Sequence, residues 1–284
     1  MSGATQLGFE GMPKPLRSVT PAKLDTFDSC PRRVRFVYVD RPAPSRGAPW
    51  AHTGIGSAVH AVLRAIWDLA PSHRSVDEVL RDLRAMWPTV GFRDPEQSRR
   101  ALAIMSEHLA AYVTEHVDFD AEPRGIERTV GAPYGDLAIS GRIDRVDELP
   151  DGSLVVIDYK TGRAVPTDDE ARASMQLAVY AVAVERTFRA RCARVELHHI
   201  PSGVIAAAEI TEQTRERQMR RAAATADDID RAKERLAGGV HPDEAYPARV
   251  SPACGHCDFW AHCADGRQIA LKDPWFAVPG ESTR

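Results

Sequence analysis

Residues 141–162 place charged side chains inside apolar runs, and this stretch constrains the fold of the chain more than any other. Two runs rich in β-branched and apolar residues flank an Asp-Gly turn signal, which predicts an antiparallel hairpin. Asp144, Asp158 and Lys160 lie within the predicted strands. Because burial of an unpaired carboxylate is costly, the two aspartates require a partner, for which a divalent metal is suited.

The spacing of these charges predicts a metal-dependent reaction on a phosphate. Asp158 and Lys160 are two apart and so share one face of a strand. Mg²⁺ prefers oxygen ligands, which Asp144 and Asp158 provide, with the backbone carbonyl of Tyr159 as a third. Phosphodiester hydrolysis needs an activated water and a stabilised phosphate charge, and one or two such ions supply both. Lys160 would orient the water or stabilise the phosphate, so we interpret the hairpin as the site of a nuclease.

Composition places limits on the class of protein. The chain has 284 residues, of which 43% are hydrophobic and 27% charged, as in soluble globular proteins. Its longest apolar run, residues 177–184, is too short for a membrane span, so we expect a cytoplasmic protein without a membrane partner. The net charge of −3 gives no overall attraction to nucleic acid, so DNA binding would need a local basic surface.

The hydrophobic period predicts one α/β domain with a mixed central sheet flanked by helices. Helical patterns dominate before residue 125, and the period then changes from 3.6 to 2. We expect a flexible arm over 1–17, the domain over 18–270 with a helical insertion at about 70–117, and a tail over 271–284.

Four further residues are candidates for the site, although each has an ordinary structural explanation. His60 lies beside the apolar face of a helix predicted to begin at about Gly56, where a histidine is usually a core residue. Gln176 and Tyr180 are four apart on one helical face and could simply bound the core. Glu127, in a predicted strand, could project towards the acidic site or face solvent.

The cysteines predict a second metal centre. Cys254, Cys257 and Cys263 are closely spaced, whereas Cys30 is more than two hundred residues upstream. Without a secretory signal no disulfide is expected, and four thiolates suit either tetrahedral Zn²⁺ or an iron–sulfur cluster. Ligand chemistry alone does not decide between them. Cys192 lies outside this spacing and is expected to be a free thiol.

The order of four motifs resembles the RecB-like branch of the PD-(D/E)XK nuclease superfamily, from about residue 18 to residue 263. The motifs are Gly56-x-x-x-His60, the runs Gly-Arg-Ile-Asp-Arg and Ile-Asp-Tyr-Lys-Thr-Gly around Asp144 and Asp158, and Gln176-x-x-x-Tyr180. The resemblance implies a restriction-endonuclease-like core, metal binding by both aspartates, and a catalytic Lys160. It also implies that His60 is a further metal ligand and that Gln176 and Tyr180 contact DNA or support the site.

Proteins of this branch also hold a [4Fe-4S] cluster through a split cysteine set. The resemblance therefore implies that Cys30, Cys254, Cys257 and Cys263 form an iron–sulfur clasp, with Zn²⁺ as the alternative. The implied function is a Mg²⁺- or Mn²⁺-dependent DNA exonuclease acting on single-stranded ends in repair or recombination. Alternatives are a Cas4-like end-processing subunit of a CRISPR adaptation complex and a noncatalytic DNA-binding scaffold. The chain has no phosphate-binding loop of a helicase, so unwinding would require a helicase or repair partner.

Overall fold

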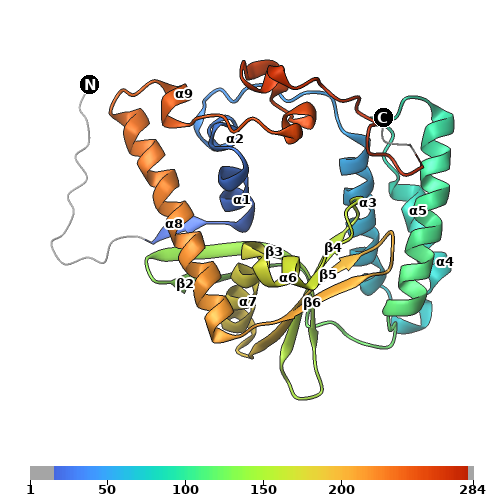
Figure 1. Cartoon of the computed structure of the whole chain (residues 1–284). Coiled ribbons are helices and arrows are strands. Elements are labelled where there is room, and N and C mark those ends of the chain that lie inside the picture. The colour runs from blue at the N-terminus through green and yellow to red at the C-terminus, as the bar shows by residue number, and fades with distance from the viewer. Residues whose placement is uncertain (1–15, 281–284) are drawn as a thin grey trace, which may run out of the picture.

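The computed structural model describes residues 16–280, in which a mixed sheet is the central layer (Figure 1). Its strands are β1 (Arg17–Val19), β2 (Gly125–Tyr134), β3 (Leu137–Glu148), β4 (Leu154–Lys160), β5 (Cys192–His199) and β6 (Ile205–Glu209). They lie in the order β1-β3-β4-β5-β6, and β2 pairs with β3 as well. The β1–β3 and β4–β5 pairs are parallel and the others antiparallel. The predicted mixed α/β sheet and its central hairpin are confirmed.

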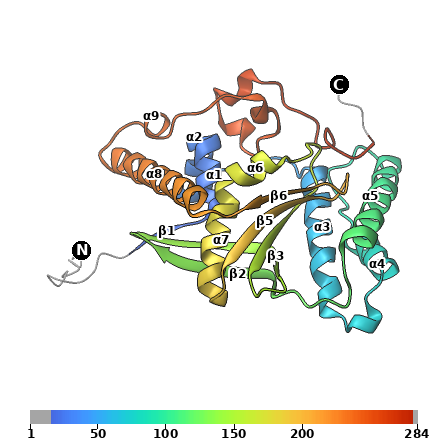
Figure 2. The ribbon, with the colours of Figure 1, turned by 60° about the horizontal axis from the view of Figure 1, so that its bottom comes forward.

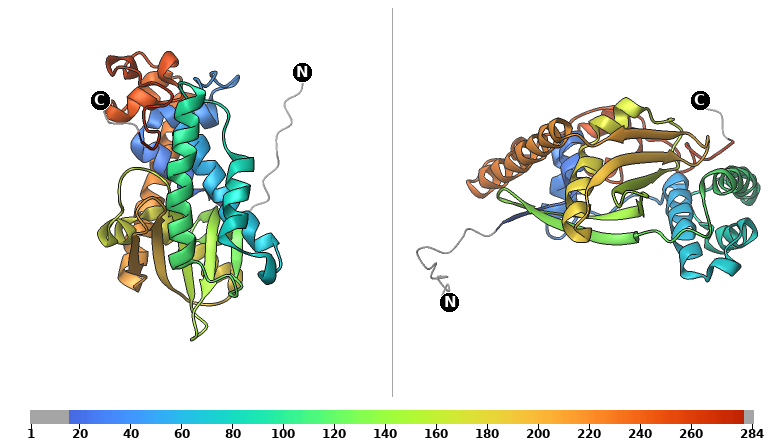
Figure 3. Two further views of the ribbon diagram at one scale, coloured as in Figure 1. Left: turned by 90° about the vertical axis from the view of Figure 1, so that its right-hand side faces the viewer. Right: turned by 90° about the horizontal axis from the view of Figure 1, so that it is seen from below.

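Helices cover both faces of the sheet. They are α1 (Pro21–Ser29), α2 (Pro31–Val34), α3 (Ala51–Ala65), α4 (Val76–Met86), α5 (Pro95–His116), α6 (Asp168–Ala173), α7 (Met175–Phe188), α8 (Glu212–Ala237) and α9 (Pro242–Ala245). Helices α3, α4 and α5 stand together at one side, and α1, α7 and α8 lie at the other (Figures 2 and 3).

Strand alternation divides most of the buried apolar residues into two cores, and Phe36, Phe259 and Cys263 form a small third cluster. Leu154 and Val156 of β4 belong to the core that includes α7 and α8. Val155, Ile157 and Tyr159 belong to the core that α3, α4 and α5 complete. Because successive side chains of a strand point to opposite faces, β4 contributes to both cores and is buried along nearly its whole length.

Capping side chains set several helix starts. Thr20 accepts a hydrogen bond from the N–H of Lys23, and Asp94 accepts one from the N–H of Gln97. Helix α3 instead begins at Ala51, five residues before the predicted Gly56. The reason is that the apolar stripe extends upstream, where Ala51 and Ile55 are buried.

The two ends of the described chain return to this frame. The predicted boundary of the amino-terminal arm falls inside β1, whose Arg17 forms an ion pair with Asp136 at 2.7 Å; residues 1–15 of that arm lie outside the described part. In the predicted tail, Val278 is buried in the α3–α5 core, and residues 281–284 are likewise not described. Across residues 16–280, none of the helices is both long and apolar enough to cross a membrane.

Candidate active site

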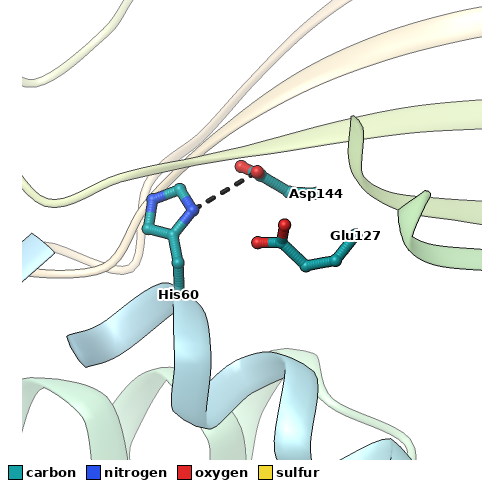
Figure 4. Close-up of side chains that lie close together, drawn as sticks. All are labelled: His60, Glu127 and Asp144. Carbon is teal, nitrogen blue, oxygen red and sulfur yellow. Dashed lines mark ion pairs between the residues drawn. The ribbon is translucent and has the colours of Figure 1, made fainter. Parts of the chain in front are cut away.

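Three side chains from three different elements converge on one point (Figure 4). They are His60 of α3, Glu127 of β2 and Asp144 of β3, and one ligand atom from each lies within 4.8 Å of the others. His60 Nδ1 is 3.3 Å from Asp144 Oδ1. One imidazole nitrogen and two carboxylate oxygens are a donor set that suits Mg²⁺ or Mn²⁺. The residues present therefore fit a divalent metal ion.

The site lies where the β3–β4 ladder opens. Regular pairing of these strands begins at Glu148 and ends at Arg145 opposite Ile157, one residue before Asp144 and Asp158. Beyond this point the backbone N–H of Tyr159 donates to Asp144 Oδ2 at 2.8 Å. A buried N–H needs an acceptor, and here a side-chain carboxylate replaces a strand carbonyl. The sequence pattern placed both aspartates in strands but did not show that the strands separate beside them.

Glu127 is in an unusual backbone conformation opposite Asp144. Its φ is +44°, in the left-handed region that residues other than glycine rarely adopt. Its neighbours Ile126 and Arg128 pair with Arg145 and Ile143, which places Glu127 level with Asp144 across the ladder. Such strain is often found at functional sites. The sequence did not show whether the Glu127 side chain faces solvent or the acidic site. The strand register shows that it lies beside Asp144.

Asp158 is held by a lysine and a glutamine. Lys160 Nζ lies 2.7 Å from Asp158 Oδ2. Gln176 of α7 donates through Nε2 to Asp158 Oδ1 at 3.0 Å and to the Tyr180 hydroxyl at 3.3 Å. Helices α7 and α3 pack on opposite faces of the sheet. The Gln176–Tyr180 pair and His60 therefore approach the two aspartates from opposite sides. Spacing of four on one helix brings the amide and the hydroxyl together, as expected.

Three carboxylates meet at the site, where Lys160 forms an ion pair with Asp158 and Arg142 forms one with Glu127. Burial raises the pKa of Asp158, and the nearby Asp144 adds to this rise while Lys160 opposes it. Burial lowers the pKa of His60, but the carboxylates of Asp144, Asp158 and Glu127 outweigh it, so that this pKa is raised. A bound cation would stabilise the ionised carboxylates at this site.

Two motif glycines permit close packing around these side chains. A Cβ at Gly141 would lie 2.4 Å from Cε1 of Tyr180, so that only glycine lets the tyrosine ring approach β3. A Cβ at Gly56 would lie 2.9 Å from the Thr161 hydroxyl, at the junction of α3 with the end of β4. The glycines thus set the distances at which α7 and α3 approach the site.

A buried polar network behind the site was not anticipated from the sequence. The Tyr112 hydroxyl lies 2.6 Å from His198 Nδ1, and His198 Nε2 lies 2.7 Å from Glu196. The Tyr159 ring packs edge-on against His60, Tyr112 and His198, with centroids 5.8 to 6.2 Å apart. The network therefore supports the strand that carries Asp158. Alternation along β5 is the one signal for it, since Glu196 and His198 share a face.

The four predicted cysteines line a single cavity of about 70 Å³. Cys30 lies between α1 and α2, and the others lie in the cysteine segment, which we define as residues 251–268. Arg32 of α2 forms an ion pair with Asp265 of this segment, with 2.6 Å between Nη1 and Oδ2. A Cβ at Gly266 would lie 3.2 Å from the Cys263 sulfur, so the glycine keeps space open beside that thiol. The four thiols fit a shared metal centre, and Cys192 lies apart, buried in β5.

The sulfurs are spread around this cavity more widely than the ligands of the acidic site. Within the described chain, His60, Glu127 and Asp144 are the residues that form a group of three potential ligands within 4.8 Å. Four sulfurs on one tetrahedral Zn²⁺, with bonds of about 2.3 Å, would lie roughly 3.8 Å apart. The sulfurs are therefore spaced more widely than the ligands of one tetrahedral ion.

The fold and these contacts define an α/β protein with a candidate metal site, and comparison with known proteins gives its family. The model of the PD-(D/E)XK nuclease superfamily matches residues 18–264, so the chain belongs to that superfamily, whose members use divalent metals. Among solved structures, SSO0001 is 18% identical over 90% of each chain, with a TM-score of 0.38. A protein from Eubacterium rectale described as a candidate exonuclease is 11% identical over 95% of each chain, with a TM-score of 0.48. No curated protein matches the chain in sequence.

Proposed function

We propose that this protein is a cytoplasmic Mg²⁺- or Mn²⁺-dependent exonuclease of the RecB-like branch, acting on single-stranded DNA ends in repair or recombination. One observation carries the proposal: His60, Glu127 and Asp144 converge within 4.8 Å, directly beside the Asp158–Lys160 pair. Nitrogen and carboxylate ligands with an adjacent ammonium are the groups that phosphodiester hydrolysis needs.

Each side chain has a distinct role in this proposal. Asp144 and Asp158 would hold the metal with His60, and Glu127 and the Tyr159 carbonyl would complete its ligands. When bound, the metal would lower the pKa of a water molecule and offset negative charge on the phosphate. Lys160 adds an ammonium that stabilises charge developing on the phosphate oxygens.

Gln176 and Tyr180 are positioning residues for Asp158. The Gln176 amide donates to Asp158 Oδ1 and leaves Oδ2 for the lysine and the metal. Tyr180 in turn lies within 3.3 Å of that amide and limits its rotation. Both could also contact a DNA strand that enters the site.

We also propose that Cys30, Cys254, Cys257 and Cys263 hold a [4Fe-4S] cluster, with Zn²⁺ as the alternative. The wide spacing of the sulfurs around one cavity supports the cluster. Its role would be to link the start of α2 to the cysteine segment. These two parts of the chain are far apart in sequence. No redox step follows from this structural role.

The activity is tested on end-labelled single- and double-stranded DNA with Mg²⁺ or Mn²⁺. Wild-type protein should shorten the single strand progressively, and Asp158→Asn should lower the rate by at least about 100-fold because a metal ligand is lost. Asp169→Asn is the matched control, since Asp169 is an exposed aspartate of α6 whose side chain is 87% accessible. Equal rates for wild type and Asp158→Asn would contradict the proposed site.

The cluster is tested by metal analysis of protein purified without oxygen. About four irons and four sulfides per chain, with a broad absorbance at the edge of the visible range, are expected. Cys257→Ser should lose both the absorbance and the iron, whereas Cys192→Ser should retain them. One zinc per chain in a colourless protein would establish the alternative.

A further inference from the structure

A large cavity lies beside the amino-terminal end of α3, separate from the two metal centres. It has a volume of about 760 Å³ and is bounded by the chain before α3, the first turns of α3 and the cysteine segment. Thr53 and Ser57 of α3 line it, and His60 is one turn further along the same helix. Because residues three and four apart share a helical face, Thr53, Ser57 and His60 lie on one face of α3.

Aromatic rings form one wall of this cavity. Trp50, His52 and His256 line it, and Phe276 packs against all three, with ring centroids 5.1 to 6.4 Å apart. An indole ring and two imidazole rings on one wall offer flat faces on which a nucleic-acid base stacks.

The cavity also carries a surplus of positive charge. Arg33 and Arg46 line it and share one carboxylate, Asp258, with each guanidinium 3.9 Å from Oδ2. Two arginines against one aspartate leave a net positive charge to attract a phosphate.

The amino-terminal end of α3 adds hydrogen-bond donors to this charge. No side-chain cap closes the helix at Trp50 within the described chain, and α3 is long enough, at 15 residues, to have a full first turn. The N–H groups of His52 and Thr53 find no acceptor among residues 16–280. Free N–H groups at a helix start bind anions, and here they lie beside the two arginines.

We propose that this cavity binds one base and its adjoining phosphate of a single-stranded polynucleotide, which then runs along α3 to the metal site. The inference rests on the proposed nuclease function and adds the path of the strand. The aromatic wall requires an unpaired base, because a base within a duplex already stacks on its neighbours. Arg46 and the first turn of α3 would hold the phosphate, and Thr53 and Ser57 would line the path to His60.

The test measures binding apart from cleavage. Full-length protein without added divalent metal is titrated against a fluorescein-labelled 12-nucleotide thymidylate, and anisotropy is recorded at several salt concentrations. Arg46→Ala and His52→Ala should each weaken binding by about five- to tenfold, as expected for a lost phosphate or stacking contact. Arg46→Ala should also reduce the salt slope by about 0.7. Arg231→Ala is the control, because its side chain on α8 is 64% exposed, close to the 67% of Arg46, and should bind within twofold of wild type.

A second readout separates this inference from the proposed function. Hydrolysis of bis(p-nitrophenyl) phosphate, which has no nucleobase, reports on the metal site with Mn²⁺, and both cavity variants should hydrolyse it at the wild-type rate. An active wild type whose cavity variants bind the oligonucleotide normally would overturn the inference alone. An inactive wild type would overturn the proposed function. The comparison of oligonucleotide binding between wild type and the cavity variants would still test the inference.

The form of the nucleic acid is tested in the same titrations. A 12-base-pair duplex should bind the wild type and both cavity variants alike, and an equal loss on duplex and single strand would overturn the single-strand assignment. A 12-nucleotide uridylate compares RNA with DNA, and the tighter ligand identifies the natural strand. If His52→Ala does not fold, the exposed Arg46→Ala decides the outcome.

Discussion

Asp144 accepts the backbone N–H of Tyr159 through Oδ2 at 2.8 Å, while its Oδ1 lies 3.3 Å from His60 Nδ1. One oxygen thus ties β3 to β4 where their ladder opens, and the other points to the centre of the acidic site. The carboxylate fixes the strands and offers a metal ligand at the same time. The effect of losing the negative charge of Asp144 can therefore be measured separately from the effect of losing its hydrogen bond.

Asp144→Asn should separate them, because an asparagine oxygen can still accept the N–H of Tyr159. We expect the nuclease rate with Mn²⁺ to fall by about 100-fold or more, since a charged ligand is lost. The melting temperature of the metal-free protein should change little, because the reduced repulsion with Asp158 offsets the lost ion pair with His60. Initial rates and thermal melts measure the two effects. A large fall in melting temperature would mean that Asp144 is chiefly structural.

Gly141→Ala should destabilise the protein by about 1–3 kcal/mol, as is usual for an overpacked contact. The added methyl would lie 2.4 Å from a carbon of the Tyr180 ring and would force the ring away from β3. Gly162→Ala is the matched control, because nothing lies within 4 Å of a Cβ placed there. Denaturant unfolding of both variants gives the comparison. Equal stabilities for the two would contradict the close packing of Tyr180.

Metal affinity should fall as the pH is lowered from 8 to 6. The pKa of His60 is raised above its usual value of about 6.5, so a proton competes with the metal over this range. His60→Gln should bind Mn²⁺ more weakly at pH 8 but with a smaller pH dependence. Calorimetric titration at several pH values measures both.

The same raised pKa of His60 has a consequence for stability without metal. The protonated histidine is favoured in the folded state, so its contribution is fully present below the unfolded pKa and is lost as pH rises through the folded pKa. The stability advantage of wild type over His60→Gln should therefore shrink between pH 6 and pH 8. A growing advantage would contradict the ion pair with Asp144.

Cys192 should resist alkylation in the folded protein. Burial raises the pKa of this thiol to about 12, and the nearby Glu185 carboxylate adds to the rise. At pH 8 only about one thiol in 10⁴ would be ionised, and the thiolate is the reactive form. Mass spectrometry after iodoacetamide treatment should find Cys192 unmodified in native protein and labelled in guanidinium. Rapid labelling of native protein would mean that β5 opens readily.

Local pattern was sufficient to predict the hairpin and much of the candidate site. Apolar, β-branched runs around an Asp-Gly turn predicted β3 and β4, and the carboxylates within those runs, Asp144 and Asp158, are the candidate site residues. Glu127 could not be directed in the same way, because its orientation depends on pairing with a strand that follows it in the chain and on its own positive φ.

The sequence by itself determined the α/β class, the hairpin with its charges and the grouping of three close cysteines, because each depends on residues near one another in the chain. Tertiary structure alone decided that β3 and β4 separate at Asp144, that Glu127 joins His60 there, and that Cys30 meets the cysteine segment. It also decided that the start of α3 forms an aromatic and basic cavity. These features depend on the packing of segments distant in sequence, which a local pattern does not encode.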